Sequence, residues 1–169
     1  MTHKWAIAPL IGLLAAGGYA GKVLADTGPP PPPPLVTTQL AKSTFGPLRL
    51  TGHAKPRALW AAKLMTRGLS DFYVVDNKFG LGTSTGWHSH PGPSLIFVVD
   101  GTVTNYDSDD PACAPHAYGK GSAFVDSGGT DVHMLRNESG LPAETIAVQF
   151  LPTGAARKTD ATEPANCHV

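Results

Sequence analysis

The sequence has no excess of charge of either sign, since its 169 residues carry 13 Lys and Arg against 13 Asp and Glu. A protein that binds the phosphates of nucleic acid usually carries an excess of positive charge, so this balance argues against a nucleic-acid partner. Long stretches free of helix breakers are also lacking, because 19 Gly and 16 Pro are spread along the chain. This density excludes a helical bundle or a coiled coil. The hydrophobic content of 41% still allows a packed core, which excludes a wholly disordered chain.

Cysteine is equally scarce, with only Cys113 and Cys167 in the chain. Two cysteines in an exported protein most economically form one disulfide. This bond would close a loop of about 54 residues and add roughly 4 kcal/mol of stability by restricting the unfolded chain. The competing interpretation is a pair of thiolate metal ligands. It has less support, because a histidine lies directly beside Cys167 but none lies directly beside Cys113.

The N-terminal end has the three parts of a secretory signal peptide. Residues 1–4 form a basic head, residues 5–20 form a short apolar run, and Val23 and Ala25 place small residues at the −3 and −1 positions of a cleavage site. The sequence therefore predicts a signal peptide over residues 1–25. We expect export to the periplasm, the cell envelope or the medium, with no stable membrane insertion after cleavage.

A retained N-terminal membrane anchor is the alternative, although the apolar run is short for a span and is interrupted by Pro9 and by glycines. Residues 26–34 follow as a proline-rich linker. Its six consecutive prolines lack backbone donors and favour polyproline II, which gives a stiff spacer of roughly 19 Å. The remaining residues, 35–169, form the predicted domain.

Short strand signals separated by glycine-rich turns fill this domain, and the sequence shows no long helical stretch. Residues 57–65 are ambiguous, because their alanines and leucines also suit a short helix. Asp100-Gly101 predicts a two-residue hairpin turn between two strands. Many short strands indicate a sandwich or a barrel. The predicted strands are residues 59–66, 71–79, 94–99, 102–106, 122–125, 132–137 and 145–151.

Three histidines form the clearest chemical pattern. His88 and His90 are two residues apart, so in an extended strand their side chains point to one face about 6.6 Å apart along the chain. A third imidazole has to come from a distant strand, and His133 is the natural candidate. Gln149 and Tyr106 lie on strands that could line the same interior. Alternation from His133 places Arg136 on the opposite face.

The spacing around these histidines resembles the two motifs of the cupin superfamily. The first motif is Gly, five residues, His-x-His, three or four residues, Glu, six residues and Gly. The second is Gly, five residues, Pro-x-Gly, two residues, His, three residues and Asn. Ser94 stands in place of the motif glutamate, Ser127 replaces the motif proline, and one extra residue precedes His133. The matching positions are Gly82, His88, His90 and Gly101 in the first motif and Gly121, Gly129, His133 and Asn137 in the second.

The resemblance covers residues 58–152 and is strongest to small exported bacterial single-domain cupins. It implies an all-β double-stranded β-helix, a jelly-roll-type barrel, in a single domain. It also implies a metal ion between the two motifs, a small-molecule ligand, and pairing through strand edges into a homodimer. The fold itself implies no particular reaction, because cupins include oxygenases, isomerases, lyases and plain binders.

The missing glutamate shapes the expected chemistry. Three neutral imidazoles suit Fe, Zn, Ni or Cu better than Mg or Ca, but they leave the charge of the ion uncompensated. Ser94 is a neutral and poor ligand, so the site is expected to attract an anionic exogenous ligand. Asp131 lies two residues before His133 and allows three interpretations: a fourth metal ligand, an outer partner that orients an imidazole, or a solvated turn residue.

Two functions of different classes remain open at this stage. The first is an exported metal-dependent cupin that carries out oxygen-dependent or Lewis-acid chemistry on a small anionic molecule. The second is a non-catalytic extracytoplasmic module that binds a ligand or has a structural role. Asp131 is the one candidate for a general base near the ion, so the sequence does not decide between an enzyme and a binding module.

Overall fold

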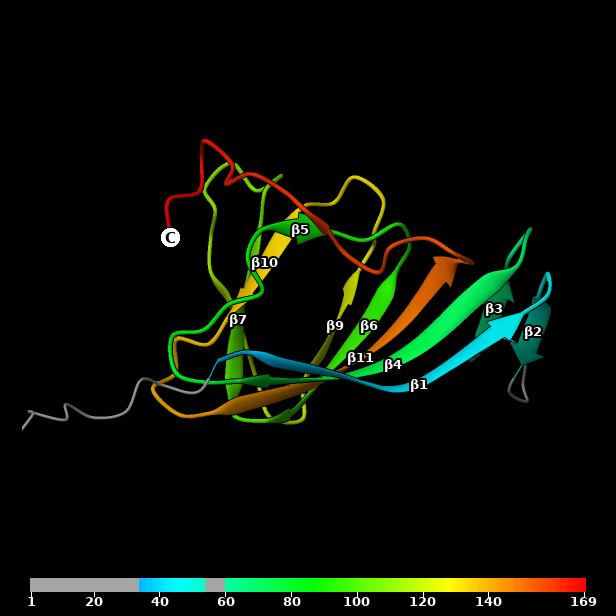
Figure 1. Cartoon of the computed structure of the whole chain (residues 1–169), viewed down its shortest axis with the longest axis horizontal. Coiled ribbons are helices and arrows are strands. Elements are labelled where there is room, and N and C mark those ends of the chain that lie inside the picture. The colour runs from blue at the N-terminus through cyan, green and yellow to red at the C-terminus, as the bar shows by residue number, and fades with distance from the viewer. Residues whose placement is uncertain (1–33, 54–59) are drawn as a thin grey trace, which may run out of the picture. The chain divides into compact units, whose positions relative to one another are not determined.

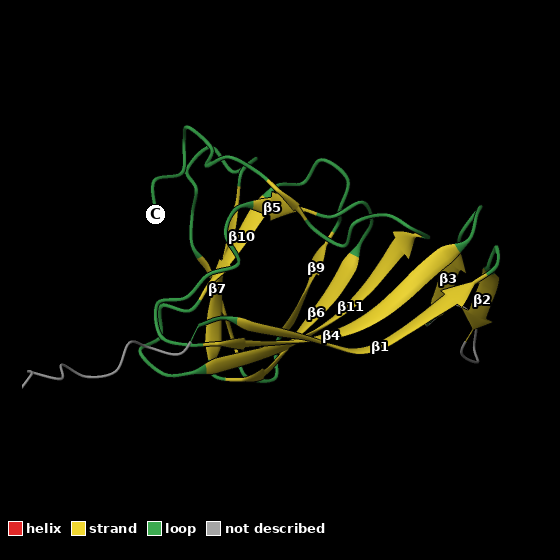
Figure 2. Cartoon of the chain, in the orientation of Figure 1, coloured by secondary structure: helices red, strands yellow, loops and turns green. Residues whose placement is uncertain are grey.

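The computed structural model describes residues 34–53 and 60–169 (Figure 1). The predicted signal peptide and all of the predicted linker except Pro34 lie outside these ranges. Within them the chain forms twelve strands and no helix (Figure 2), so no described helix could span a membrane. The strands are β1 (Val36–Phe45), β2 (Arg49–His53), β3 (Ala61–Met65), β4 (Ser70–Phe79), β5 (His88–Ser89), β6 (Ser94–Asp100), β7 (Thr102–Asp107), β8 (His116–Gly119), β9 (Ala123–Asp126), β10 (His133–Arg136), β11 (Ala143–Pro152) and β12 (Thr159–Asp160).

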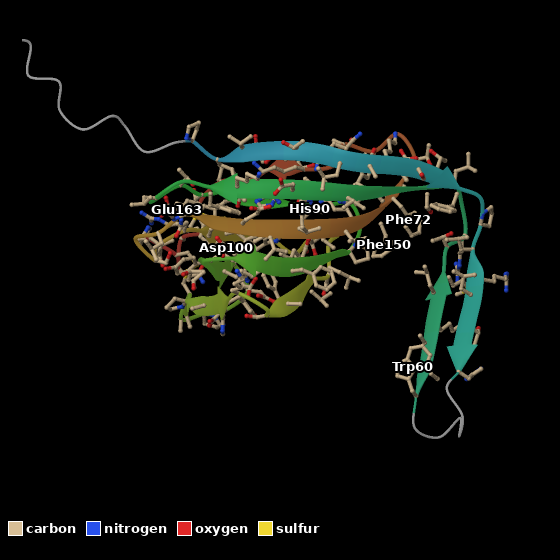
Figure 3. All side chains as sticks on the ribbon, turned by 90° about the horizontal axis from the view of Figure 1, so that it is seen from below. Trp60, Phe72, His90, Asp100, Phe150 and Glu163 are labelled. Carbon is tan, nitrogen blue, oxygen red and sulfur yellow. A yellow bond between two sulfur atoms is a disulfide. The ribbon has the colours of Figure 1, made fainter. Side chains whose placement is uncertain are left out.

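Ten of these strands form two antiparallel sheets. The first has the order β1-β4-β11-β6-β9, which Figure 3 shows side by side, and the second has the order β12-β5-β10-β7-β8. From β4 onward the chain passes repeatedly from one sheet to the other, as it does in a jelly roll. The predicted all-β double-stranded β-helix is therefore confirmed. β2 and β3 pair only with each other among the described strands, so residues 61–65 are strand rather than the short helix also considered.

The predicted hairpin at Asp100-Gly101 is wrong. β6 and β7 lie in different sheets and do not pair, so the chain turns a corner between the sheets at Gly101. Gly101 has a φ of 66°, and a Cβ at this position would collide with the carbonyl oxygen of Pro142. A dipeptide that favours tight turns serves here to change sheets, so that Val98 of β6 and Val103 of β7 pack in one core cluster from different sheets.

The core lies between the two sheets and follows the alternation of side chains along the strands. On β6, Ile96 and Val98 are buried while Phe97 points outward and is 43% exposed. β11 alternates in the same way over its whole length. Apolar side chains on the inner faces form two packed clusters: Tyr73, Val75, Ile96, Ala147 and Leu151 in one, and Phe79, Val98, Val103, Leu135 and Ala143 in the other.

β1 is a long edge strand that the sequence did not reveal. All ten of its residues are exposed, and it pairs with β4 along its whole length. The buried carboxylate of Asp71 joins the two strands, since it accepts a hydrogen bond from Thr44 Oγ1 at 2.6 Å and forms an ion pair with Lys42 Nζ at 2.9 Å. These two contacts hold the pKa of Asp71 well below its usual range.

The predicted disulfide between Cys113 and Cys167 is present. Cys167 is fully buried and belongs to one apolar cluster with Cys113, Trp87, Tyr106 and Met134. The bond therefore fastens the C-terminal end of the chain to the loop that follows β7. Tyr106 packs in this cluster and donates its hydroxyl hydrogen to Glu138.

Candidate metal centre

The three predicted histidines come together on the second sheet. His88 begins β5 and His133 begins β10, and the two are direct cross-strand partners. His90 follows β5 directly. The ring centroid of His88 lies 4.8 Å from that of His90 and 4.5 Å from that of His133, and the His90 and His133 centroids are 5.4 Å apart. The nitrogen atoms that these residues offer all lie within 4.8 Å of one another.

Backbone carbonyls set the tautomers of two of the rings. His88 Nδ1 is 2.8 Å from the carbonyl oxygen of Gly86, and His90 Nδ1 is 2.5 Å from that of Arg157. A carbonyl oxygen only accepts, so each Nδ1 must carry the hydrogen. The Nε2 atom of each neutral ring is then left with a free lone pair, which is the form of histidine that binds a metal.

Burial keeps these rings neutral. It lowers the pKa of His88 to about 3, with the neighbouring His133 adding to the effect. Burial also lowers the pKa of His90. At neutral pH both imidazoles are therefore uncharged and competent as ligands.

Asp126 is a site residue that the sequence analysis missed. It is buried at the end of β9, directly opposite Ser94 in the strand register. Its Oδ2 lies 3.6 Å from His90 Nε2, and its Oδ1 lies 3.8 Å from His133 Nδ1. A buried carboxylate thus stands beside two of the three histidines, across from the serine that replaces the motif glutamate.

The other expected site residues are divided between two pockets, a cavity beside the three histidines and a smaller pocket that shares His133 with it. Ser94 is fully buried and lines the same cavity as the histidines. Gln149 lies on β11, and its Nε2 is 3.3 Å from His90 Nδ1. Asp131 groups with Asp126 and His133 rather than with the other two histidines. Burial raises the pKa of Asp131. Arg136 lies near Glu138 and outside both pockets, as alternation predicts.

A cavity of about 300 Å³ opens beside the three rings. Arg157 and Lys158 supply positive charge to it, and the lining contains no acidic residue. Arg157 Nη1 donates to Gln149 Oε1 at 3.1 Å, and Lys158 Nζ donates to the carbonyl oxygen of Thr85 at 2.8 Å. The lining residues are Leu35, Thr37, Val75, Asn77, Thr85, His88, His90, Ser94, Ile96, His133, Leu135, Ala147, Gln149, Arg157 and Lys158.

The residues present fit a divalent transition metal. Two neutral rings have free Nε2 atoms, and His133 Nδ1 is buried without a hydrogen-bond partner. An all-imidazole donor set suits Fe, Zn, Ni or Cu. Asp126 adds a negative charge beside the rings, so the expectation that the protein leaves the ion uncompensated needs correction.

No protein-family model matches the sequence, and no curated protein matches it either. Solved structures resemble parts of the fold. The polyketide cyclase RemF from Streptomyces resistomycificus is 19% identical with a TM-score of 0.45, and the match covers 56% of this chain and 65% of that one, just under two thirds. A protein with a double-stranded β-helix domain from Klebsiella pneumoniae is 18% identical with a TM-score of 0.46, covering 70% and 86%. A cupin superfamily protein from Desulfitobacterium hafniense is 8% identical with a TM-score of 0.43, covering 68% and 82%.

The solved structures that resemble this fold thus include members of the cupin superfamily. On its own sheet order, the chain is a double-stranded β-helix that gathers three histidines beside a cavity lined in part by Arg157 and Lys158.

Proposed function

We propose that this chain is an exported metal-dependent cupin whose cavity takes a small anionic molecule. One observation carries the proposal: three histidines, with His88 and His133 buried and His90 partly buried, lie within ligand distance of one another at the wall of a cavity that also holds Arg157 and Lys158. Lys158 Nζ pairs with Asp160 Oδ1 at 2.7 Å, so Arg157 supplies the charge that is available to a ligand, and a guanidinium suits a carboxylate or phosphate in particular.

His88, His90 and His133 would hold the ion. A divalent ion bound there would act as a Lewis acid and would make bound water more acidic. The chain itself contributes orientation. The carbonyl groups of Gly86 and Arg157 fix two rings through their Nδ1 atoms, and Asp126 lies beside His90 Nε2 and His133 Nδ1, where its carboxylate would offset the charge of the ion.

Arg157, beside the histidines, would bind the ligand. Arg157 is held in place by Gln149 and lies over the ring of Tyr73, with Cζ 5.8 Å from the ring centroid. Its guanidinium is thereby fixed before a ligand arrives, which reduces the entropy lost on binding. The reaction type that we propose is oxygen-dependent or Lewis-acid chemistry on this anion.

Elemental analysis of the mature protein, purified from its native location, tests the metal. We expect about one Fe, Zn, Ni or Cu per chain at the histidines, and its loss in the His88→Ala and His133→Ala variants. His116→Ala is the matched control, because His116 is exposed on β8 and outside the cavity. A wild-type protein that stays free of transition metal after reconstitution would overturn the proposal.

Ligand binding and turnover are measured separately. With a panel of small carboxylates and phosphates, Arg157→Ala should weaken binding at least tenfold, while Lys63→Ala on the exposed β3 should not. Oxygen consumption or product formation with the metal-loaded protein supports an enzyme. Tight binding of an anion without turnover supports the non-catalytic module instead.

Export and pairing are tested on the same preparation. We expect the intact mass of the exported protein to correspond to a chain that begins at Asp26, after removal of residues 1–25. A retained anchor would leave the full mass. Light scattering at several concentrations tests the predicted homodimer, and a constant monomer mass would contradict it.

A further inference from the structure

A second pocket shares His133 with the histidine cavity and has the opposite charge. It encloses about 190 Å³ and is lined by four aspartates, with no Lys or Arg among its lining residues. We call it the acidic pocket. Its polar lining residues are Asn105, Asp107, Asp109, Asp126, Asp131 and His133.

Three polar atoms in this lining are buried without a hydrogen-bond partner: Asn105 Oδ1, Asp126 Oδ2 and His133 Nδ1. Their residues are only 6%, 4% and 3% exposed, so solvent at the surface does not satisfy them. The amide of Asn105 is fixed, because its Nδ2 donates to Asp107 Oδ1 at 2.8 Å and leaves the oxygen free. An unpaired buried polar atom is destabilising, so the two oxygens among them, Asn105 Oδ1 and Asp126 Oδ2, indicate a bound partner in this pocket.

The chemistry of these atoms identifies the class of partner. Asp126, Asp131 and His133 each offer a ligand atom within 4.8 Å of the other two. Bound water would satisfy hydrogen bonds but would leave four carboxylates without a counter-charge. Carboxylate and amide oxygens are the ligands that hard divalent cations such as Ca²⁺ and Mn²⁺ prefer.

We propose that the acidic pocket binds a second divalent cation, of the hard class, through the oxygens of Asn105, Asp126 and Asp131. This site is separate from the ion that the three histidines would hold, and it does not need His88 or His90. Asp126 stands beside both positions, so the two ions would share one carboxylate.

The test uses the full mature chain stripped of metal, titrated by calorimetry with Ca²⁺ alone and with Mn²⁺ alone. Ca²⁺ is the more selective probe, because an all-imidazole site suits it poorly. We expect a Kd of about 1 mM or tighter for at least one ion. The His88→Ala variant should bind that ion within about threefold of the wild-type affinity. Asp131→Asn should weaken it at least tenfold.

Asp100→Asn is the matched control, because it removes one negative charge from an exposed residue outside the pocket. It should leave the Kd unchanged, and thermal unfolding of each variant checks the fold. The proposal is overturned if neither ion binds, if His88→Ala abolishes binding, or if Asp131→Asn and Asp100→Asn have equal effects. The transition-metal content of the wild type reports on the histidine site independently, so failure of one site is distinguishable from failure of the other.

Discussion

Loss of the Cys113–Cys167 bond should destabilise the domain by an amount that the structure allows us to calculate. The cysteines are 54 residues apart, and in the chain-entropy model a loop of this length restricts the unfolded chain by about 14 cal/mol/K, or about 4 kcal/mol at 25 °C. For a domain of this size, that corresponds to a fall in Tm of roughly 15 °C. The double variant Cys113→Ala/Cys167→Ala should show this loss.

Urea unfolding followed by far-UV circular dichroism measures the effect. The midpoint should fall and the slope with denaturant should rise, because the unfolded chain without the cross-link exposes more surface. Wild-type protein with reduced thiols keeps both side chains and separates the loss of the bond from the loss of packing around buried Cys167. A loss of less than about 1 kcal/mol at unchanged slope would refute the loop-closure reasoning.

Four further substitutions give three predictions with defined outcomes. Gly129→Ala, at a φ of 73° in open space, should cost about 1–2 kcal/mol in thermal unfolding. Gly128→Ala, at a φ of 69°, should cost clearly more, because its Cβ would collide with a facing backbone carbonyl. Equal losses would contradict this. Asp71→Asn should lower stability at pH 7 but not at low pH. Because the pKa of Asp71 is lowered on folding, its contribution is present above the unfolded pKa of about 4 and is lost as the pH falls toward the folded value. Parallel pH profiles for wild type and variant would rule this out. Asp126→Asn should weaken transition-metal binding about 10–100-fold in competition with a chromophoric chelator, with Asp100→Asn unchanged. An unaltered affinity in Asp126→Asn would show that the carboxylate does not support the ion.

Most of the strands that the sequence predicted have a buried inner face, and the exception is β3, which is largely exposed and pairs with β2. β4, β6 and β11 are rich in β-branched and aromatic residues, and their sequence pattern reflects the core against which they pack. β1 carries no such pattern, because every residue from Val36 to Phe45 is exposed and its pairing with β4 decides its conformation. The short strands β8 and β12 likewise depend on their neighbours in the second sheet.

The site was predictable only where a motif marked it. The spacing of His88, His90 and His133 was informative, because the motif places them around one point. The sequence signal for Asp126 was weaker. Phe124 faces inward two residues earlier, so alternation would place Asp126 on the same face, but the predicted strand ended at residue 125. Arg157 follows β11 and lies outside both motifs, so only the folded chain shows that it reaches the histidines.

Arg157 serves the histidines through its main chain and the cavity through its side chain. The carbonyl group that holds His90 is present whatever amino acid stands at this position, except where the backbone itself is displaced. Exchanging the side chain would therefore alter which molecules are admitted while the imidazole keeps its hydrogen bond. A single codon change at this position would thus alter the side chain that the cavity presents and leave the hydrogen bond that orients His90 in place.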